Sequence, residues 1–537
     1  MKKSISLLLV LTMLLGFASV AARGEAIEGV PDLRGKTVRL LSMETYASSG
    51  SFSDIMPLFK RYEEMTGVTI EWDSFSTDYV TVMQTRLAAG INLPDVVSLG
   101  GSLDLSLASK LIEDEMFVNI NDYLDDLPNI SRFFNESRPD IRRSLTYYDG
   151  GIYLLPCSTY NNREDEFRKL QNGGDNIIWY RKDIADKLGI GCPTTIDEMH
   201  ALLLAYKDYD PDMIPMLVRD WTTWCSPYVF AGSYGLHFEQ MDSSSDYFYP
   251  DENDRIVFEP ITDAALEFVT EMNKWYSEGL FGFNADRQAL AASGKAGAVW
   301  YQKDANRIST NKLLAENGFP EGHFAPVPWL YGPEAKRGIG MRAPFGGVVG
   351  ITDTENAKTA LEFLDFVFFS DFGIACQLAG VYGDNWYYDE NGMPMLNDET
   401  LQAWYVDKTG NWRTVGGGVH IRMPQIKDYN IEYGLIQQLI DCGINEPFTE
   451  ESLNAYLDWQ DAAFETLPFM FYTQDEMEEY NSLYMDIKTY VQESLTRFIM
   501  GEEPLANWAA YKENVQKMGI EKVVAIVQSA YDRYLSN

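Results

Sequence analysis

The sequence has 537 residues, with 43 Lys and Arg against 80 Asp and Glu, and its formal net charge is −37. So long a chain exceeds the size at which one hydrophobic core keeps growing, and we expect two lobes or domains. The negative charge repels nucleic acid and anionic membrane surfaces, so neither is expected as a partner. Five cysteines are too few for a disulfide scaffold, and their odd number leaves at least one thiol unpaired.

The N-terminal segment, residues 1–26, has the pattern of a secretory signal peptide. A basic start precedes a nearly continuous apolar run from Leu7 to Val20, which is too short to span a bilayer comfortably. Cleavage after Ala22 or Ala26 would remove this segment. The first cysteine is Cys157, so no cysteine that could be lipidated lies near the cleavage site. We therefore expect a freely soluble export, located outside the cell or in the periplasm.

From residue 36 onward the chain alternates strand and helix patterns. Short apolar strands are predicted at 36–41, 68–75 and 93–101. Between them, apolar residues at helical spacing predict helices near 55–66 and 79–89. This β-α-β-α-β order is typical of a parallel sheet with helices on both faces. Ligands of such sheets bind beyond the carboxyl ends of the strands, which here means the loops after the first and third strands.

Further motifs follow in order along the chain. They are YYDGGIYLLP (147–156), IIWYRKDIADKLGI (177–190), GKAGAVWYQ (294–302), FGGVVGIT (345–352) and the helical segment 480–534. Their order and spacing resemble those of the bacterial extracellular solute-binding proteins of sugar importers, the maltose-binding-protein class. The C-terminal helices resemble the long oligosaccharide-binding branch of that class, which includes the alginate-oligosaccharide receptors.

The resemblance implies an α/β, two-lobed periplasmic-binding-protein fold. Each lobe would be a mainly parallel sheet flanked by helices, with the ligand cleft between the lobes. We expect the first lobe at 27–155 and 329–395, and the second at 156–328 and 396–537. A monomer would capture a carbohydrate, close by hinge rotation and deliver the ligand to the permease of an ABC importer. This function requires no cofactor and no covalent chemistry.

Signatures of catalysis are sparse. None of the four histidines has a second one four residues away, and there is no G-x-S-x-G elbow or G-x-x-x-x-G-K-[ST] phosphate loop. Residues 338–343 formally fit G-x-G-x-x-A, but they follow a polar turn rather than a strand, so we interpret the match as chance. A glycosidase needs only two carboxylates, and so acidic a chain offers many pairs. A secreted glycoside hydrolase or lyase is therefore the alternative function; a surface adhesin would need repeats and a wall-attachment tail.

The candidate ligand-binding residues combine aromatic rings with polar groups. Sugar rings present an apolar face that packs on an aromatic ring, while carboxylates and amides bind their hydroxyls. The resemblance places Tyr180 and Trp300 at ligand-stacking positions, with core packing as the alternative for both. The other candidates lie at turns or strand ends, and for Glu44, Tyr46 and Asp384 plain surface is the alternative. The full set is Glu44, Tyr46, Ser98, Tyr160, Tyr180, Trp221, Trp224, Trp300, Asp384 and Trp386.

One acidic segment, DENDRIVFE (251–259), offers hard oxygen ligands at alternating positions, which suit Ca²⁺. Its candidate ligands are Asp251, Asn253, the main-chain oxygen of Arg255, and Glu259. The segment resembles the D-x-N-x-K-x-x-x-D calcium loop of the alginate-oligosaccharide receptors, but Pro260 replaces a second carboxylate. A structural Ca²⁺ is therefore a hypothesis, and a hairpin turn that binds no ion is its alternative.

Overall fold

The computed structural model describes most of the chain beyond its N-terminal segment. The described residues are 27–43, 56–75, 77–99, 105–157, 176–221, 226–238, 247–302, 304–333, 336, 339–340, 345–416, 423–424, 426, 428–444, 454, 458, 463–464 and 467–536. No helix among them is long and apolar enough to cross a membrane. The expected signal peptide, residues 1–26, lies outside the described residues.

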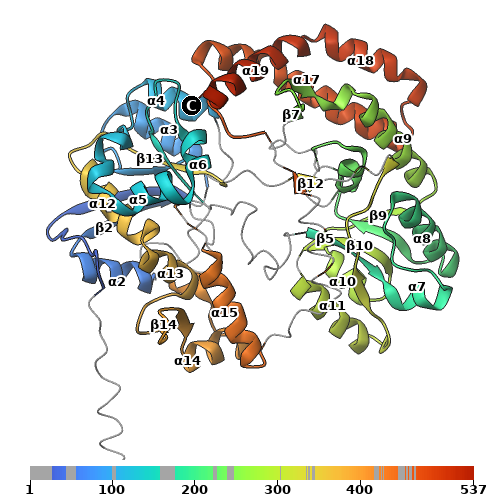
Figure 1. The fold of residues 1–537 in the computed structure, drawn as a ribbon, viewed down its shortest axis with the longest axis horizontal. Coiled ribbons are helices and arrows are strands. Elements are labelled where there is room, and N and C mark those ends of the chain that lie inside the picture. Colours follow the sequence, from blue (N-terminus) through green and yellow to red (C-terminus); the bar gives the residue numbers. More distant parts are fainter. Residues whose placement is uncertain are drawn as a thin grey trace, which may run out of the picture.

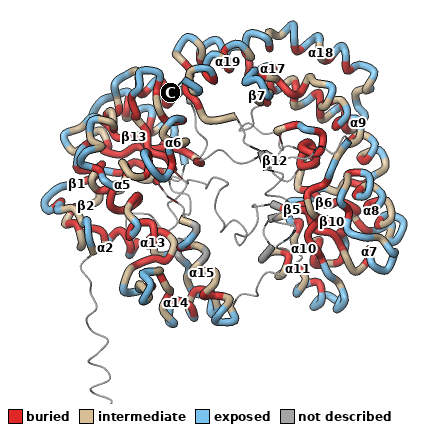
Figure 2. The backbone as a smooth tube through the Cα atoms, in the orientation of Figure 1, coloured by how far each residue is buried: buried red, intermediate tan, exposed pale blue. Residues whose placement is uncertain are grey.

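The described chain forms two lobes that lie on opposite sides of the molecule (Figure 1). Each lobe has its own hydrophobic core, built around a five-stranded sheet. Figure 2 shows buried residues inside each lobe and exposed residues on its outer helices. The two-lobed α/β fold expected from the sequence is therefore confirmed.

The sheet of the first lobe consists of β1 Thr37–Met43, β2 Thr69–Phe75, β3 Val96–Ser98, β4 Leu154–Pro156 and β13 Val348–Ile351. Its strand order is β2-β1-β3-β13-β4. β1 is parallel to β2 and β3, whereas β13 is antiparallel to β3 and β4. Four strands therefore run in one direction and β13 runs against them. Leu40, Val96 and Val97 in the central strands are fully buried, as expected of a strand covered on both faces.

Helices of the first lobe follow the predicted alternation. They are α2 Pro57–Thr66, α3 Tyr79–Ala89, α4 Leu105–Glu113, α5 Pro128–Arg132, α6 Pro139–Leu145, α12 Ala357–Leu364 and α13 Asp371–Ala379. In α2, Pro57 occupies the first turn, where its missing N–H costs no hydrogen bond. Leu58, Phe59 and Tyr62 turn inward, and Gly67 ends the helix with a φ of 74°, a conformation that favours glycine.

The sheet of the second lobe consists of β5 Asn176–Arg181, β6 Ile214–Val218, β9 Phe281–Phe283, β10 Ala296–Gln302 and β11 Phe324–Pro326. Its order is β11-β5-β10-β6-β9. β10 is parallel to β6, and β6 to β9, whereas β5 is antiparallel to β10 and β11. This sheet also has one strand, β5, that runs against the other four.

The second lobe also contains helices and a hairpin. They are α7 Lys182–Leu188, α8 Ile196–Tyr209, β7 Phe248–Pro250, β8 Ile256–Phe258, α9 Asp263–Ser277, α10 Arg287–Ala292 and α11 Asp304–Glu316. Gly297 in β10 allows α8 to approach closely, because a Cβ there would come within 2.4 Å of the Tyr206 ring. The absence of a side chain at this position therefore sets the distance between helix and sheet.

Three C-terminal helices complete the second lobe and reach the first. They are α17 Gln474–Met500, α18 Trp508–Lys517 and α19 Ile520–Ser536. Asn273 of α9 donates from Nδ2 to the main-chain oxygen of Phe498 at 3.0 Å, which fastens α17 to α9. At the other end, the Arg143 guanidinium of α6 lies 5.7 Å from the ring centroid of Tyr534. The helices therefore arch from one lobe to the other (Figure 1).

The first lobe extends further along the chain than expected. Residues from Leu396 to Leu439 belong to the first core, although we expected residues from 396 onward in the second lobe. The elements involved are β14 Trp386–Tyr388, β15 Pro394–Leu396, α14 Asp398–Leu401 and α15 Tyr429–Asp441. Gln438 of α15 explains the placement, since its side-chain amide bonds both main-chain groups of Leu396, at 3.0 and 2.7 Å. A short parallel pair, β12 Ile339–Gly340 and β16 Ala463–Phe464, joins the segment before β13 to the segment before α17.

We predict that the α17 cap stabilises the C-terminal arch. Thr473 accepts from the Glu476 N–H and Glu476 accepts from the Thr473 N–H, a capping box. Thr473→Ala should lower the free energy of unfolding by about 1 kcal/mol, measured by urea denaturation. Thr473→Ser keeps the hydroxyl and should behave like the wild type. Equal stability of the Ala and Ser variants would show that the cap contributes nothing.

Candidate functional site

The reversed strand in each sheet determines which edges of the two lobes face each other. The chain leaves the first lobe after Pro156, at the carboxyl end of β4, and enters the second at Asn176. Because β5 is antiparallel to β10, Asn176 lies opposite Gln302, at the edge where β10 ends. The chain returns after Pro326, at the carboxyl end of β11, and re-enters at Val348, beside Pro156. Both crossings therefore join the carboxyl edge of one sheet to that of the other.

The candidate site is the region between these two carboxyl edges. In the first lobe, β1, β2 and β3 end there at Met43, Phe75 and Ser98. In the second lobe, β6 and β9 end there at Val218 and Phe283. Ligands of open α/β sheets bind beyond such ends, so this arrangement places a ligand in contact with both lobes.

Trp221, which follows the end of β6, belongs to a cluster of aromatic rings from the edge strand β9 and the last turn of α9. Its ring centroid lies 4.7 Å from Phe283, 5.5 Å from Tyr276 and 6.4 Å from Phe281. Trp221 is half-buried and Phe283 is 37% exposed. We call Trp221, Tyr276, Phe281 and Phe283 the edge aromatic cluster. It leaves aromatic surface open beside the site.

A charged pair precedes the edge aromatic cluster. Arg219 Nε lies 3.5 Å from Asp220 Oδ2, and both side chains are 38% exposed. The guanidinium donates hydrogen bonds and the carboxylate accepts them, so the pair can bind hydroxyl groups of either role. The sequence pattern singles out Trp221 but not Tyr276 or Phe283. The available signal was the F-G-F strand 281–283, whose period of two places both phenyl rings on one face.

Tyr180 and Trp300 lie in the second core. They are 2% and 1% exposed, and they occupy the same face of two neighbouring interior strands, β5 and β10. An interior strand of a sheet that helices cover on both faces buries every side chain. The burial supports the core-packing alternative for both rings, and their ligand-stacking role remains a prediction.

Three other candidates lie within the first lobe. Ser98 is fully buried, and its main-chain oxygen accepts from the Tyr79 hydroxyl. Trp386 is fully buried and donates from Nε1 to the Gly380 oxygen at 2.8 Å, so the structure supports core packing for this ring. Asp384 is on the surface, where its Oδ2 accepts from Arg61 Nη2 at 3.2 Å. Four candidates, Glu44, Tyr46, Tyr160 and Trp224, lie outside the described residues.

The four candidate calcium ligands lie on the β7–β8 hairpin and do not converge. Asp251 faces Arg255 across the turn, whereas Glu259 pairs with Tyr247 at the far end of the hairpin. Position 259 lies four residue steps beyond position 255 along the strand, which is about 13 Å at about 3.3 Å per residue. Oxygen ligands lie about 2.3–2.6 Å from a bound calcium ion. The carboxylates of Asp251, which is opposite Arg255, and of Glu259 are therefore too far apart to bind the same ion. The strand geometry therefore supports the alternative of a hairpin turn that binds no ion, and the calcium site remains a prediction.

Each of these carboxylates also has another partner. Asp251 Oδ2 accepts from Arg255 Nε and Nη2 at 2.9 and 2.7 Å. Glu259 is 6% exposed and accepts from the His237 main-chain N–H at 2.8 Å, while its other oxygen contacts His237 Nδ1. Within the described part of the chain, no group of three or more His, Cys, Asp or Glu could hold a metal ion. The residues at 251–259 therefore do not fit a calcium site.

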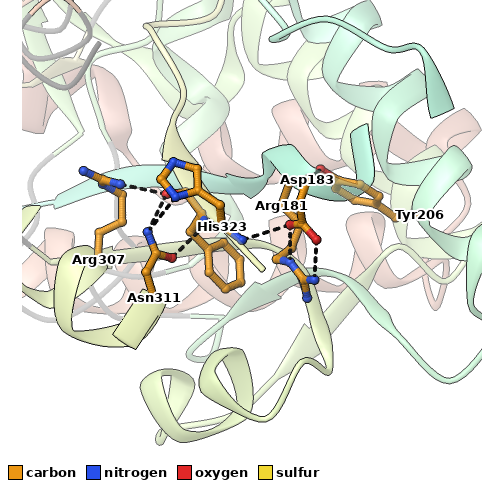
Figure 3. Close-up of polar contacts among 7 residues, drawn as sticks. Arg181, Asp183, Tyr206, Arg307, Asn311 and His323 are labelled. Atoms are coloured by element: carbon orange, nitrogen blue, oxygen red, sulfur yellow. Dashed lines mark hydrogen bonds and ion pairs between the residues drawn. The ribbon is translucent and has the colours of Figure 1, made fainter. Parts of the chain in front are cut away.

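A polar network fixes β11, the strand from which the chain returns to the first lobe (Figure 3). Arg181 donates from Nε and Nη2 to the two oxygens of Asp183, at 2.7 and 2.8 Å. The His323 main-chain N–H donates to Asp183 Oδ1 at 3.1 Å. Asn311 bonds the main-chain N–H and oxygen of Phe324, and Arg307 donates to the same oxygen at 2.7 Å. Together these polar side chains fix the backbone of β11 in position.

Asp183 stays ionised in this network. Burial tends to raise the pKa of Asp183, but hydrogen bonds from the Arg181 guanidinium and the His323 amide outweigh burial, so its pKa lies below the ordinary value. The Arg181 guanidinium also lies 5.6 and 5.7 Å from the ring centroids of Phe319 and Phe324. A permanently paired carboxylate of this kind has a structural role rather than that of a general acid.

We predict that Asp183→Asn destabilises the second lobe by about 3 kcal/mol, since it leaves the Arg181 guanidinium buried without a counter-ion. Asp186→Asn is the matched control, because its partner Lys182 is 36% exposed. Because the folded pKa of Asp183 is lowered, its contribution is present above the unfolded value of about 3.9 and is lost as pH falls through the folded value. Urea denaturation of both variants at pH 7 and in acid measures their free energies of unfolding. A stability of Asp183→Asn equal to that of the control would contradict the assignment.

Comparisons with known proteins agree with this architecture. The chain is 21% identical over 534 residues to the fructooligosaccharide ABC transporter substrate-binding protein FusA of Streptococcus pneumoniae serotype 4, covering 95% of this chain and 93% of FusA. A FusA EF-hand mutant in complex with fructo-nystose superposes with a TM-score of 0.68 at 19% identity, covering 94% of this chain and 100% of that one.

Two further solved structures have the same fold. A solute-binding protein of Bifidobacterium longum infantis, described as HMO-binding, has a TM-score of 0.70 at 20% identity and covers 93% of this chain and 99% of its own. The alginate-binding protein AlgQ2 without calcium ion has a TM-score of 0.65 at 21% identity, and the match covers 93% of this chain and 98% of AlgQ2. Residues 46–371 match the family described as bacterial extracellular solute-binding protein. The chain therefore belongs to the bacterial extracellular solute-binding protein family.

Proposed function

We propose that this protein captures an oligosaccharide outside the cell and delivers it to an ABC importer. The observation that carries the proposal is the edge aromatic cluster, an open aromatic surface with a charged pair beside it, at the carboxyl edge that faces the other lobe. FusA is named as a fructooligosaccharide-binding protein of an ABC transporter, and AlgQ2 is named as alginate-binding. Oligosaccharides are thus the ligands of relatives with this architecture.

The chemistry of the edge aromatic cluster fits a sugar ligand. The apolar face of a sugar ring packs on Trp221 or Phe283, and its hydroxyls bond Arg219 and Asp220. Closure of the lobes then surrounds the ligand and removes it from water. The closed form is the state that the importer's permease would bind, with the protein acting as a monomer.

The protein would bind its ligand without chemical change. Members of its family bind solutes, and the charged network around Asp183 holds a strand instead of presenting a free acid or base. A thermal-shift screen of neutral and acidic oligosaccharides tests binding, because a ligand of the folded state raises the melting temperature. Chromatography of the bound sugar tests turnover: cleavage in proportion to protein concentration would favour the glycoside hydrolase or lyase alternative.

We predict that Trp221→Ala weakens binding of the best oligosaccharide from that screen by roughly 30-fold, equivalent to about 2 kcal/mol, measured by calorimetric titration. Tyr387→Ala removes a more exposed ring, 49% exposed, from β14 in the first lobe and should leave the affinity unchanged. Undiminished affinity of Trp221→Ala would remove the edge aromatic cluster from the binding site.

Trp300→Ala separates core packing from ligand stacking. A fully buried tryptophan leaves a cavity when truncated, so we expect a loss of about 3–5 kcal/mol of stability. If the variant melts normally and binds the oligosaccharide weakly, the ligand-stacking role holds after all. The same pair of measurements applies to Tyr180→Ala.

We also propose that residues 1–26 form a signal peptide and that the protein is released without a lipid anchor. Mass spectrometry of the exported protein should give an N-terminus after Ala22 or Ala26 and no diacylglycerol. An exported chain that still begins at Met1, or one that carries a lipid, would contradict this.

A further inference from the structure

We propose that the β7–β8 hairpin carries its own cation, the guanidinium of Arg255, and is stabilised without calcium. AlgQ2 without calcium ion and the FusA EF-hand mutant are solved states of proteins with this architecture, so calcium is a question for this chain as well. The acidic hairpin 251–259 is the segment whose sequence spacing suggests a site. Its geometry instead assigns the positive charge to a side chain of the hairpin itself.

Arg255 lies where an ion bound to Asp251 would compete with it. Its Nε and Nη2 both donate to Asp251 Oδ2, while Asp251 Oδ1 accepts the main-chain N–H groups of Asn253 and Arg255 at 2.8 and 3.0 Å. The main-chain oxygen of Arg255, a candidate calcium ligand, accepts from the Asp251 N–H at 2.8 Å. Every candidate oxygen of these two residues therefore already has a donor.

The other side of the turn is held by α19. Gln528 Oε1 accepts from the Ile256 main-chain N–H at 2.7 Å, and Gln528 Nε2 donates to the main-chain oxygen of Asp254 at 2.9 Å. The Tyr531 hydroxyl donates to Asp254 Oδ1 at 3.3 Å. The hairpin is thus joined directly to α19 of the C-terminal arch by these hydrogen bonds.

A second hairpin in the same chain provides an internal comparison. In the β14–β15 turn, Asp389 Oδ1 accepts from the Asn391 and Met393 N–H groups, both at 2.8 Å, as Asp251 does from Asn253 and Arg255. The Asp389 N–H donates to the Met393 oxygen at 2.9 Å. The two turns share their backbone hydrogen bonds, but methionine stands where the first has arginine. Arg255→Met therefore converts the first turn to the chemistry of the second.

Thermal melting of wild type, Asp251→Asn, Arg255→Met and the double variant, each in EDTA and in millimolar CaCl₂, tests the proposal. We expect the wild type to melt at the same temperature in both solutions. Each single variant should melt about 1–2 °C lower, and the double variant no lower than either, since all three remove one ion pair. The difference between wild type and Arg255→Met should shrink in about 1 M NaCl. Asp389→Asn is the matched control and should cause a smaller shift.

Two outcomes would overturn the proposal. One is a rise in wild-type melting temperature with calcium that Asp251→Asn abolishes, which would place the ion in this hairpin. The other is an unchanged melting temperature for Arg255→Met in EDTA, which would leave the guanidinium without a stabilising role. A calcium response that is equal in wild type and Asp251→Asn would place the ion elsewhere and support the assignment of the hairpin.

Discussion

In each five-stranded sheet one strand runs against the other four, β13 in the first lobe and β5 in the second. A chain that moves between two lobes must leave one sheet and enter the other, and the reversed strand lets it do both at the carboxyl edge. The two edges are consequently held face to face by the covalent chain. The position of the candidate site, the placement of Trp221 beside it and the burial of Tyr180 within the sheet all depend on this constraint.

The chain that returns to the first lobe is fixed by polar contacts before it leaves the second. Asp183 and Arg181 hold the start of β11, and beyond this strand the Trp329 N–H donates to Asp458 Oδ2 at 2.7 Å. When one lobe rotates against the other, the backbone at these contacts stays in place and the bending falls on the segments outside them. Charge is used here to limit where the backbone can bend, since a buried ion pair tolerates little displacement.

Much of the fold could be predicted from the sequence because it rests on local patterns. The strands at 37–43, 69–75 and 96–98 and the helices between them follow from apolar periodicity. The position of a strand within its sheet leaves no such pattern. Trp300 lies in a central strand and Trp221 beside an edge strand, and only the strand order separates a core ring from an open one. The calcium hypothesis had the same weakness, because equal spacing in sequence gives different distances in a loop and in a hairpin.

The C-terminal arch also determines when the lobes can fold. Asn273 and Phe498, which bond each other, are 225 residues apart, and the second core includes Val491 and Leu495 of α17. The first core likewise draws on residues from Leu33 to Phe471. Contacts between such distant residues form slowly, since each closes a long loop of chain. Neither lobe can complete its core while the ribosome is still at the middle of the chain, so the two lobes mature together rather than in order of synthesis.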